Sequence, residues 1–417
     1  MILVQNHRLL SSGSKLLAVL FLCGFLGACA PKILRPGGKG PKEPSKESPT
    51  KKEEKPEEKK EAKAPIQFNN IALLLPFQLD KVIDSLPNSR DVERSALALD
   101  FYQGFKLGLD QVAKAGDNFK LHVLDTRDNI LEVQKIAVDT NISAAQIVVG
   151  PVFPTEINAF SGRANLSGKL QISPLAASSP VGNQVNNLVT VTPTIAVHAD
   201  VIGHYVAKQY GSAADHVVIF NNNDEDSRKL LDPLKAVLDQ LNVHYVEINE
   251  LGDMETSLGA IGKNVVINAS TNQFFVAPLL ADLARLKTEQ SYDITLIGHP
   301  NWNKLDLNPD HLETLNTCIS SSYYVDENST ATGVFRANYV KAFNVAPSEF
   351  AYKGYDTGVF FAKLLAKYPK DYVEHLVKEK HKGVAIGFAF VFNPTTGYVN
   401  NSVRLLRFNR RAYRPLP

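Results

Sequence analysis

From residue 67 to the end of the chain, short apolar runs alternate with longer segments in which apolar positions recur with a helical period. The apolar runs are typical of buried strands and comprise residues 71–77, 121–125, 145–150, 170–173, 217–220, 264–270 and 293–298. Apolar strands that alternate with helices are typical of parallel sheets covered on both faces. The pattern therefore predicts an α/β fold with doubly wound layers, in which ligands bind beyond the carboxyl ends of the strands.

The segment 95–114 is a clear amphipathic helix in this pattern. Its large apolar side chains recur at four-residue intervals, at Leu97, Phe101, Phe105 and Leu109. These positions share one face of a helix, so that face is predicted to pack against the core. Gly104 and Gly108 have the same spacing on another face, and we expect them to allow close packing of the helix against a strand.

The segment 388–408 has a different pattern, because apolar and polar residues alternate on both sides of a turn at 395–397. Alternation with a period of two is typical of strands that are buried on one face. The turn contains Gly397, which can adopt the backbone conformations of tight turns. The segment is therefore predicted to form an antiparallel hairpin.

The first residues combine basic side chains with a short apolar run. The basic residues, the last of them Lys15, precede the apolar run 16–29. This run is too short to span a bilayer comfortably and is typical of a secretory signal. It ends in LGAC, which resembles the lipobox of bacterial lipoproteins. That resemblance implies a signal peptide at 1–28 and a lipid-modified Cys29; the alternative is a buried helix with an incidental cysteine.

Residues 29–66 are rich in lysine, glutamate and proline and have almost no apolar side chains. Such a segment cannot bury enough apolar surface to offset the entropy of ordering, so we expect a disordered tether. Lysine and glutamate are interspersed and nearly balanced, which disfavours a nucleic-acid-binding arm. We expect this tether to hold the following residues near a membrane, to which only the lipid is attached.

The composition of the whole chain is ordinary for a globular protein, with 44% hydrophobic residues, 21% charged residues and a formal net charge of +2. The 350 or so residues after the tether are enough for two lobes. Cys23 lies in the signal and Cys29 at its end, so only Cys318 remains with a free thiol. No intrachain disulfide is therefore expected in the mature protein.

The sequence gives little support to catalysis. It contains no G-x-S-x-G elbow, no phosphate-binding P-loop and no dinucleotide glycine fingerprint. Histidine pairs such as His198 and His204, or His375 and His381, lack the spacing of zinc ligands on a helix. Cys318 lies in a predicted strand and is interpreted as a small core residue. We therefore expect a protein that is not an enzyme and that uses no cofactor or metal.

Six segments, taken in their order along the chain, carry a resemblance to a known family. They are IALLLPF at 71–77, FYQGFKLGLD at 101–110, LHVLDTRDN at 121–129, AAQIVVGPVFPTEINAFS at 144–161, LQISPLAASSP at 170–180 and FAYKGYDTGVFFAKLLAK at 350–367. Together they resemble the type I periplasmic binding proteins, which include the branched-chain amino-acid-binding proteins. Within that superfamily, NVVINASTNQFFVAPLLADLARL at 264–286 and the tether are more weakly similar to outer-membrane lipoproteins that activate penicillin-binding proteins, in their carboxyl-terminal domain.

The resemblance implies two Rossmann-like lobes that are joined by three crossings of the chain. The first lobe would comprise residues 67–195 and 326–380. The second lobe would comprise residues 196–325 and 381–417, so that the predicted hairpin would complete the second lobe.

The resemblance also implies that loops at the strand ends hold a ligand with backbone amides and small hydroxyls, which suit a carboxylate or phosphate. In LQISPLAASSP, Ala177 and Ser178 match an alanine–threonine pair of the amino-acid-binding relatives. Ser173 ends the strand before them. The alternative is that these small residues form an ordinary turn or helix cap.

A second loop, which begins at Gly150, departs from the pattern of the relatives. Amino-acid binders usually have a small hydroxyl residue about four positions after this glycine, whereas this chain has Pro154. Proline offers neither a hydroxyl nor a backbone N–H group. Phe153 and Thr155 flank the proline and are candidate ligand residues. The departure disfavours an α-amino acid as the ligand.

Five further positions are candidate ligand residues because they lie on loops that follow predicted strands or line the hinge: Asn222, Asp224, Ser270, Asn272 and Tyr355. The asparagine, aspartate and serine residues have an alternative role as turn or N-cap residues. Asp356 is expected to cap a helix that begins there. No acidic residue is an obvious partner for the ammonium group of an amino acid.

Two functions fit the same fold. The first is a scaffold or regulator of cell-wall synthesis, similar to the activators of penicillin-binding proteins, with such a protein as its partner. Ala30 after Cys29 would place this lipoprotein at the outer membrane, facing the periplasm. The alternative is a solute receptor that closes on an amino acid or another small polar ligand and delivers it to an ABC permease. Closure would require that both lobes contact the ligand.

Overall fold

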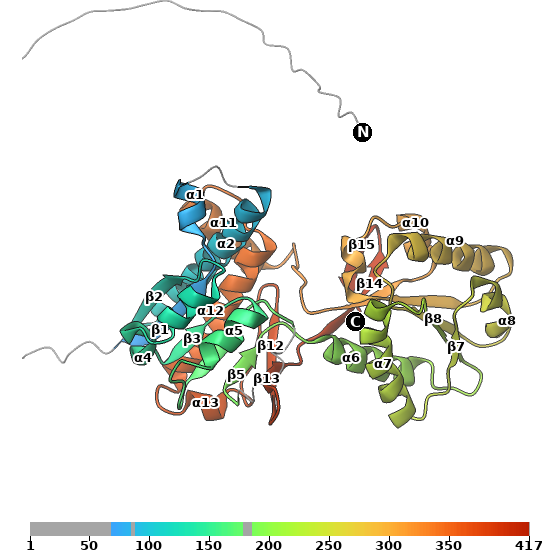
Figure 1. Ribbon diagram of the computed structural model, residues 1–417. Helices are drawn as coiled ribbons and strands as arrows, with labels where there is room; N and C mark the ends of the chain where they lie inside the picture. The colour runs from blue at the N-terminus through green and yellow to red at the C-terminus, as the bar shows by residue number, and fades with distance from the viewer. Residues whose placement is uncertain (1–67, 85–87, 178–185, 417) are drawn as a thin grey trace, which may run out of the picture. The chain divides into compact units, whose positions relative to one another are not determined.

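The computed structural model describes residues 68–84, 88–177 and 186–416, all within one compact unit, Ala64–Pro417 (Figure 1). Cys29, the predicted signal peptide and the predicted tether lie outside the described residues. The unit contains two β-sheets with helices, one sheet in each lobe. The α/β fold with two lobes that the sequence pattern predicts is confirmed.

The strands of the first lobe are β1 (Asn69–Leu75), β2 (Phe119–Asp125), β3 (Ile147–Val149), β4 (Leu170–Ser173), β5 (Leu188–Thr190), β11 (Lys380–Lys382), β12 (Gly387–Asn393) and β13 (Gly397–Asn400). They form one sheet in the order β11-β12-β13-β5-β4-β3-β1-β2. Strands β1 to β5 pair in parallel, and β13 joins them in parallel with β5, whereas β12 and β11 are antiparallel additions.

The helices of the first lobe are α1 (Leu79–Asp84), α2 (Ser89–Ala113), α3 (Ile130–Ile136), α4 (Thr140–Ala144), α5 (Pro154–Ser161), α11 (Thr330–Phe343), α12 (Glu349–Lys367) and α13 (Tyr372–His375). Helices α2 and α12 pack on one face of the sheet, where the phenylalanines of α2 join the core. Helices α3, α4 and α5 pack on the other face, where they bury Val133, Ile142 and Phe160. Both faces are therefore covered.

The strands of the second lobe are β6 (His216–Phe220), β7 (Val246–Ile248), β8 (Asn264–Asn268), β9 (Ile294–Gly298), β10 (Cys318–Ser321), β14 (Arg404–Asn409) and β15 (Ala412–Pro415). They form a sheet in the order β15-β14-β10-β9-β8-β6-β7. The helical elements around it are α6 (Ile195–Gln209), α7 (Glu225–Gln240), η1 (Leu251–Asp253), α8 (Met254–Ser257), α9 (Gln273–Glu289), η2 (Pro300–Lys304) and α10 (Pro309–Thr314). Strands β6 to β10 are parallel, and β14 and β15 are antiparallel additions.

The chain passes from one sheet to the other three times, as the family resemblance implies. It leaves the first sheet after β5, returns to it after β10, and leaves it again between β13 and β14.

The predicted hairpin exists, but its placement in the second lobe was wrong. Strands β12 and β13 are antiparallel around a turn at 394–396, and β13 then pairs in parallel with β5 of the first sheet. Phe388 and Phe390 of β12 are buried in the core of the first lobe, where Phe388 stacks on Phe360 of α12 with ring centroids 4.5 Å apart. Burial of these aromatic rings draws the hairpin to the first sheet, and only β14 and β15 complete the second.

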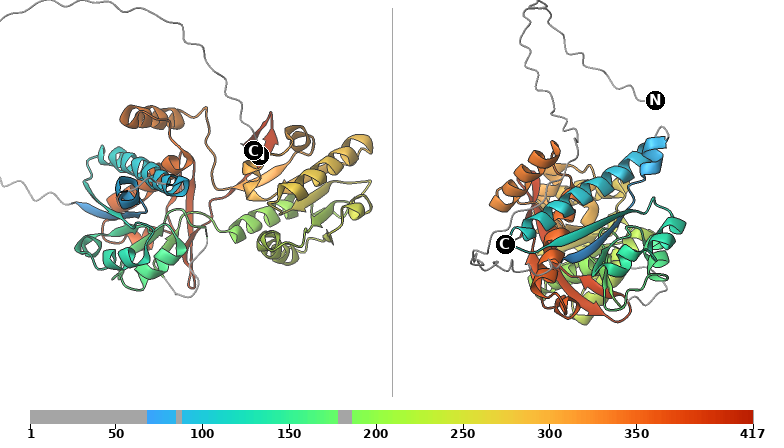
Figure 2. Two further views of the ribbon diagram at one scale, coloured as in Figure 1. Left: turned by 45° about the horizontal axis from the view of Figure 1, so that its top comes forward. Right: turned by 90° about the vertical axis from the view of Figure 1, so that its left-hand side faces the viewer.

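Helices α2 and α12 lie side by side along much of their length (Figures 1 and 2). A Cβ atom at Gly104 would overlap the carbonyl oxygen of Ala351, and one at Gly354 would overlap the carbonyl oxygen of Phe101. Gly108 of α2 and Gly358 of α12 approach the facing backbone in the same way. The glycines of α2 therefore allow close packing against a helix, not against a strand as the sequence predicted.

None of the helices in the described ranges has both the length and the hydropathy that are needed to cross a bilayer.

Candidate functional site

The loops at the carboxyl edge of the first sheet meet around β1. This strand lies between β2 and β3, so successive connections leave it in opposite directions along the sheet. Open α/β sheets bind their ligands at such a topological switch point. The loops that follow β1, β2 and β3 therefore form the first half of the candidate site.

Phe153 lies on the loop that follows β3. It precedes α5 at the N-cap position, and its half-buried ring packs against the core of the first lobe. The guanidinium carbon of Arg94 lies 5.1 Å from the centre of the ring, and Arg94 also forms an ion pair with Asp128. A cation over an aromatic face is attracted to it. Arg94 thus links the loop after β3 to the loop after β2.

Glu156, in the first turn of α5, is a buried acid beside Phe153. Its side chain is 2% exposed, and neither carboxyl oxygen has a hydrogen-bond partner of normal geometry. Burial raises the pKa of Glu156 to about 7, although the nearby Thr126 hydroxyl, backbone N–H groups and Arg94 act in the opposite direction. The side chains of Gln78 and Thr126 are likewise buried without partners. The switch point therefore holds buried polar groups that are closed to solvent.

Replacing Glu156 with glutamine is expected to raise the free energy of unfolding by about 2–3 kcal/mol at pH 8 and to change it little at pH 4. The folded protein holds the Glu156 proton up to about pH 7, whereas the carboxyl releases it near pH 4.5 in the unfolded chain. The wild-type protein therefore loses stability as the pH rises through this interval. Urea unfolding of both proteins across the interval measures the difference, and the exposed Glu93→Gln serves as control.

The loop after β4 contains the other candidate residues of the first lobe. Ser173 ends β4 and is buried, and its hydroxyl has no hydrogen-bond partner. Ala177 is exposed, as is Thr155 of α5. Ser178, the match to the threonine of the amino-acid binders, lies outside the described residues. Its role as a ligand residue stays a prediction.

In the second lobe, the candidate residues after β6 bond to the protein itself. The side-chain oxygen of Asn222 accepts a 2.6 Å hydrogen bond from the amide of Asn268. Asp224 is the N-cap of α7 and accepts hydrogen bonds from the backbone N–H (2.7 Å) and the hydroxyl (2.5 Å) of Ser227. These are the ordinary turn and capping roles of asparagine and aspartate.

The candidate residues after β8 are used in the same way. The hydroxyl of Ser270, which is fully buried, accepts a 3.2 Å hydrogen bond from the N–H of Asn272. The backbone oxygen of Ser270 accepts a 2.8 Å bond from the indole N–H of the buried Trp302. Asn272 is the N-cap of α9 and accepts from the N–H of Phe274.

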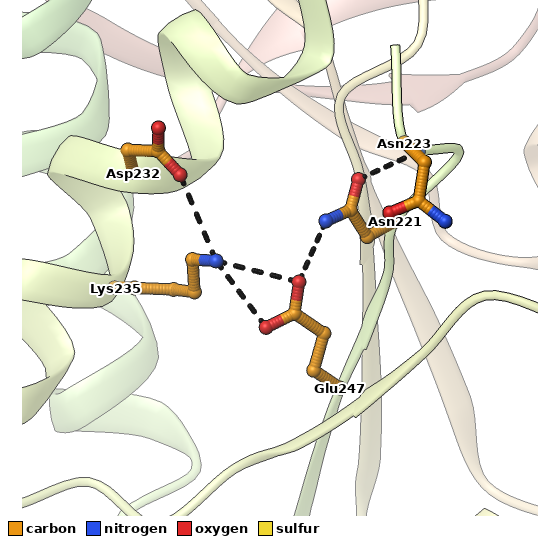
Figure 3. Close-up of polar contacts among 5 residues, drawn as sticks. All are labelled: Asn221, Asn223, Asp232, Lys235 and Glu247. Atoms are coloured by element: carbon orange, nitrogen blue, oxygen red, sulfur yellow. Dashed lines mark hydrogen bonds and ion pairs between the residues drawn. The ribbon is translucent and has the colours of Figure 1, made fainter.

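A further network fixes the loop after β6 (Figure 3). The amide of Asn221 donates a 2.6 Å hydrogen bond to the carboxylate of Glu247, which is also bound by Lys235 at 3.2 Å. The side-chain oxygen of Asn221 accepts from the N–H of Asn223. Lys235 also pairs with Asp232 at 3.6 Å. The polar groups of this loop therefore satisfy one another.

Large apolar side chains are exposed at the same edges. Phe274 and Phe275, in the first turn of α9, are 88% and 49% exposed. Leu79 after β1 and Ile130 and Leu131 after β2 are also exposed. The sequence analysis missed these residues. The available signal was the pair of phenylalanines that begins two residues after Asn272, a candidate N-cap, where a helix that follows a strand begins.

Comparison with models of protein families assigns the chain to one family. A family model described as "Periplasmic binding protein" matches residues 94–389, which is more than half of the sequence. The chain belongs to the periplasmic binding protein family. This is a family of binding proteins and not of enzymes. A search of curated proteins gave no match.

Solved structures of several other proteins share the fold. A putative branched-chain amino acid ABC transporter from Rhodospirillum rubrum has a TM-score of 0.61 and 14% identity, over 84% of this chain and 100% of that chain. A branched-chain amino acid ABC transporter periplasmic ligand-binding protein from Burkholderia xenovorans has a TM-score of 0.55 and 11% identity, over 84% of this chain and 95% of that chain. Full-length LpoA from Haemophilus influenzae has a TM-score of 0.53 and 14% identity, over 85% of this chain and 59% of that chain.

This periplasmic binding protein has a small pocket, of about 230 Å³, at the chain crossings. Ala177, His198, His299 and Ser320 are among the residues that line it. One ring nitrogen of His198 lies 2.9 Å from the hydroxyl of Ser320. Burial lowers the pKa of both histidines to about 4, so both rings are neutral at pH 7. No sequence pattern indicates this pair, because the two residues are distant in the chain.

Tyr355 and Asp356 do not begin a helix, because α12 starts at Glu349 with Ser348 as its N-cap. Tyr355 lies inside α12, and its ring centre is 4.4 Å from that of Phe335. Tyr355 does not line the pocket at the crossings. The Asp356 carboxylate accepts hydrogen bonds from three backbone N–H groups of residues 384–386, so it caps another segment and not its own helix.

Cys318 lies in β10 with no exposed surface, as the sequence analysis predicts for a core residue. Burial raises the pKa of its thiol, which disfavours a reactive thiolate. No group of three or more histidine, cysteine, aspartate or glutamate side chains in the described ranges has an arrangement that could hold a metal ion.

Proposed function

We propose that this periplasmic binding protein is a non-catalytic envelope protein that regulates or scaffolds cell-wall synthesis by binding a protein partner. One observation carries the proposal. At the carboxyl edge of the second sheet, the polar candidate residues bond to the protein itself, whereas the large apolar side chain of Phe274 is exposed. A small polar ligand needs free polar partners, whereas exposed aromatic side chains such as Phe274 suit the surface of a protein partner.

The proposed location rests on the first residues of the chain. The signal-like run and the lipobox-like LGAC support lipid attachment at Cys29, and Ala30 supports the outer membrane. The segment 29–66 would then let the folded unit reach a partner away from the membrane. The resemblance to lipoprotein activators supports a penicillin-binding protein as that partner.

Ligand screening tests the proposal against the receptor function. Thermal unfolding of the full chain with amino acids, short peptides and nucleotides is expected to show no stabilisation. A ligand at a hundred times its dissociation constant would add about 2.7 kcal/mol to the free energy of unfolding, which this assay detects. A clear shift with an amino acid would contradict the proposal.

Partner binding tests the exposed edge directly. We expect Phe274→Ser to weaken binding to a purified penicillin-binding synthase at least about tenfold, because exposed aromatic residues dominate such interfaces. Ile261→Ser is the matched control, since Ile261 is 83% exposed but precedes β8 at the opposite edge of the same sheet. An equal loss of affinity for the synthase in both variants, or no loss of affinity in either, would count against this edge as the binding surface.

The pocket at the crossings favours a second candidate function, that of a solute receptor. Its volume of about 230 Å³ suits a molecule of amino-acid size, and Lys353 and Asn301 line it together with the histidines. Ala177→Trp would fill this pocket from an exposed position. If the ligand screen gives a shift that Ala177→Trp abolishes, the receptor function replaces the regulator.

A further inference from the structure

A pocket in the first lobe has a volume of about 760 Å³. The end of α2, one face of α12 and the strand β11 surround it. Its α2 side ends at Asp117, just before β2 begins, so the pocket lies toward the amino edge of the sheet. It is therefore separate from the switch point and from the pocket at the crossings.

The floor of this pocket is apolar and firmly packed. Val112 of α2 and three residues of α12, Val359, Phe360 and Leu364, line it and are themselves buried. Phe360 is stacked on Phe388 of β12, with ring planes 4° apart. Such a floor offers an apolar surface that does not need to rearrange when a ligand binds.

Two of the three acids that line the pocket already have partners. Asp356 accepts the three backbone hydrogen bonds from residues 384–386. Glu379 accepts a 2.9 Å bond from Lys367 and a 2.8 Å bond from the hydroxyl of Tyr368. The remaining acid, Asp117, is half-buried on the α2 side.

The pocket has more lysines than acidic groups that could pair with them. Lys363 lies on the same face of α12 as Val359 and Phe360, is exposed, and has no acidic group within 4.0 Å in the described part of the chain. The same holds for Lys380 and Lys382 on the edge strand β11. His381 between them turns its ring toward Phe360, at 6.3 Å between ring centres. The pocket therefore combines an apolar floor with free positive charge.

We infer that this pocket binds an anionic amphiphile, a molecule with an acyl or aromatic body and a carboxylate or phosphate head. The body covers Val359, Phe360 and Leu364, and the head lies against Lys363. Pockets of roughly 300–1,000 Å³ take small molecules of this kind, held by an apolar lining and a few polar groups. A wholly polar anion would leave the floor uncovered, and a neutral amphiphile would leave the lysine unpaired.

Calorimetric titration of the full chain with decanoate, decyl phosphate and neutral decanol tests the inference. Lys363→Met keeps the apolar stem and removes the charge, so it should weaken decanoate binding about five- to tenfold and leave decanol unchanged. Ala331→Trp adds bulk at an exposed position of the lining and should weaken the binding of all three ligands at least tenfold. Lys208→Met and Ala281→Trp, at exposed positions of the second lobe, are the matched controls.

The inference is overturned if decanoate and decanol bind with equal affinity, or if Lys363→Met or Ala331→Trp behaves like its control. Thermal unfolding without ligand shows whether each variant is folded. Flotation with phosphatidylcholine vesicles, with and without phosphatidylglycerol, identifies the source of the amphiphile. Binding to anionic vesicles that both variants abolish indicates a membrane lipid, whereas binding of decanoate alone indicates a free molecule.

Discussion

Replacing Gly104 with alanine is expected to lower the free energy of unfolding of the first lobe by about 3 kcal/mol, near the upper end of the cost of overpacking. The new Cβ atom would overlap the carbonyl oxygen of Ala351 on α12. A side chain could rotate away from such a contact, whereas a backbone oxygen moves only with its helix. Helices α2 and α12 would have to separate. Phe101 and Phe105 of α2, which are both fully buried, would then lose packing contacts.

Urea unfolding followed by circular dichroism measures this effect. Gly333→Ala is the matched control, because Gly333 lies inside α11 and a Cβ atom there meets no atom within 4 Å. That control is expected to stabilise the protein by about 0.5–1 kcal/mol, since alanine favours a helix over glycine. A loss at Gly104 below about 1 kcal/mol would show that the two helices are less tightly packed than described.

Replacing Asp356 with alanine is expected to lower the free energy of unfolding by about 3 kcal/mol at pH 7. The substitution leaves three backbone N–H groups, those of Val384, Ala385 and Ile386, without their acceptor, and an unmade buried hydrogen bond costs about 1–3 kcal/mol. The substitution also removes a buried carboxylate, whose burial is unfavourable because it raises the pKa of Asp356 to about 6. Removal of this unfavourable burial offsets part of the cost. The segment before β12 should loosen as well.

Hydrogen exchange at residues 384–386 reports this loosening directly, and urea unfolding gives the free energy. Asp356→Asn keeps one acceptor oxygen and should lose about half as much. Asp110→Ala is the surface control, because Asp110 forms only an exposed ion pair with Lys106, which contributes less than about 0.5 kcal/mol. Equal exchange rates in the wild-type protein and in Asp356→Ala would contradict the proposed role.

Most of the parallel strands were predicted, because they are apolar over most of their length, whereas the three-residue strands β5 and β7 were missed. The run 71–77 became β1, whose residues from Ile71 to Leu75 are fully buried. The predicted burial of the apolar row on α2 is also confirmed, because Phe101 and Phe105 are core residues. The error over the hairpin has a physical cause. Alternation predicts that β12 and β13 pair, but the choice of sheet depends on the aromatic rings of α12, which are distant in sequence.

The candidate site was harder to predict, because a polar residue on a loop can face a ligand or the protein. Asn222, Asp224, Ser270 and Asn272 all follow strands as expected, and all four bond within the second lobe. Their partners, such as Asn268, are set by the folded loops. Glu156 could not be identified as a buried acid from its sequence, since it follows an ordinary proline at a helix start.

The sequence by itself determined the α/β layers, the family and the order of the loops, because these follow from local periodicity and from segments that are contiguous in the chain. Only the tertiary structure decided which sheet receives the hairpin, which helix faces the glycines of α2, and which polar groups remain free. Each of these depends on contacts between distant residues, and the energy of burying a ring or pairing a hydrogen bond is fixed only when both partners are in place.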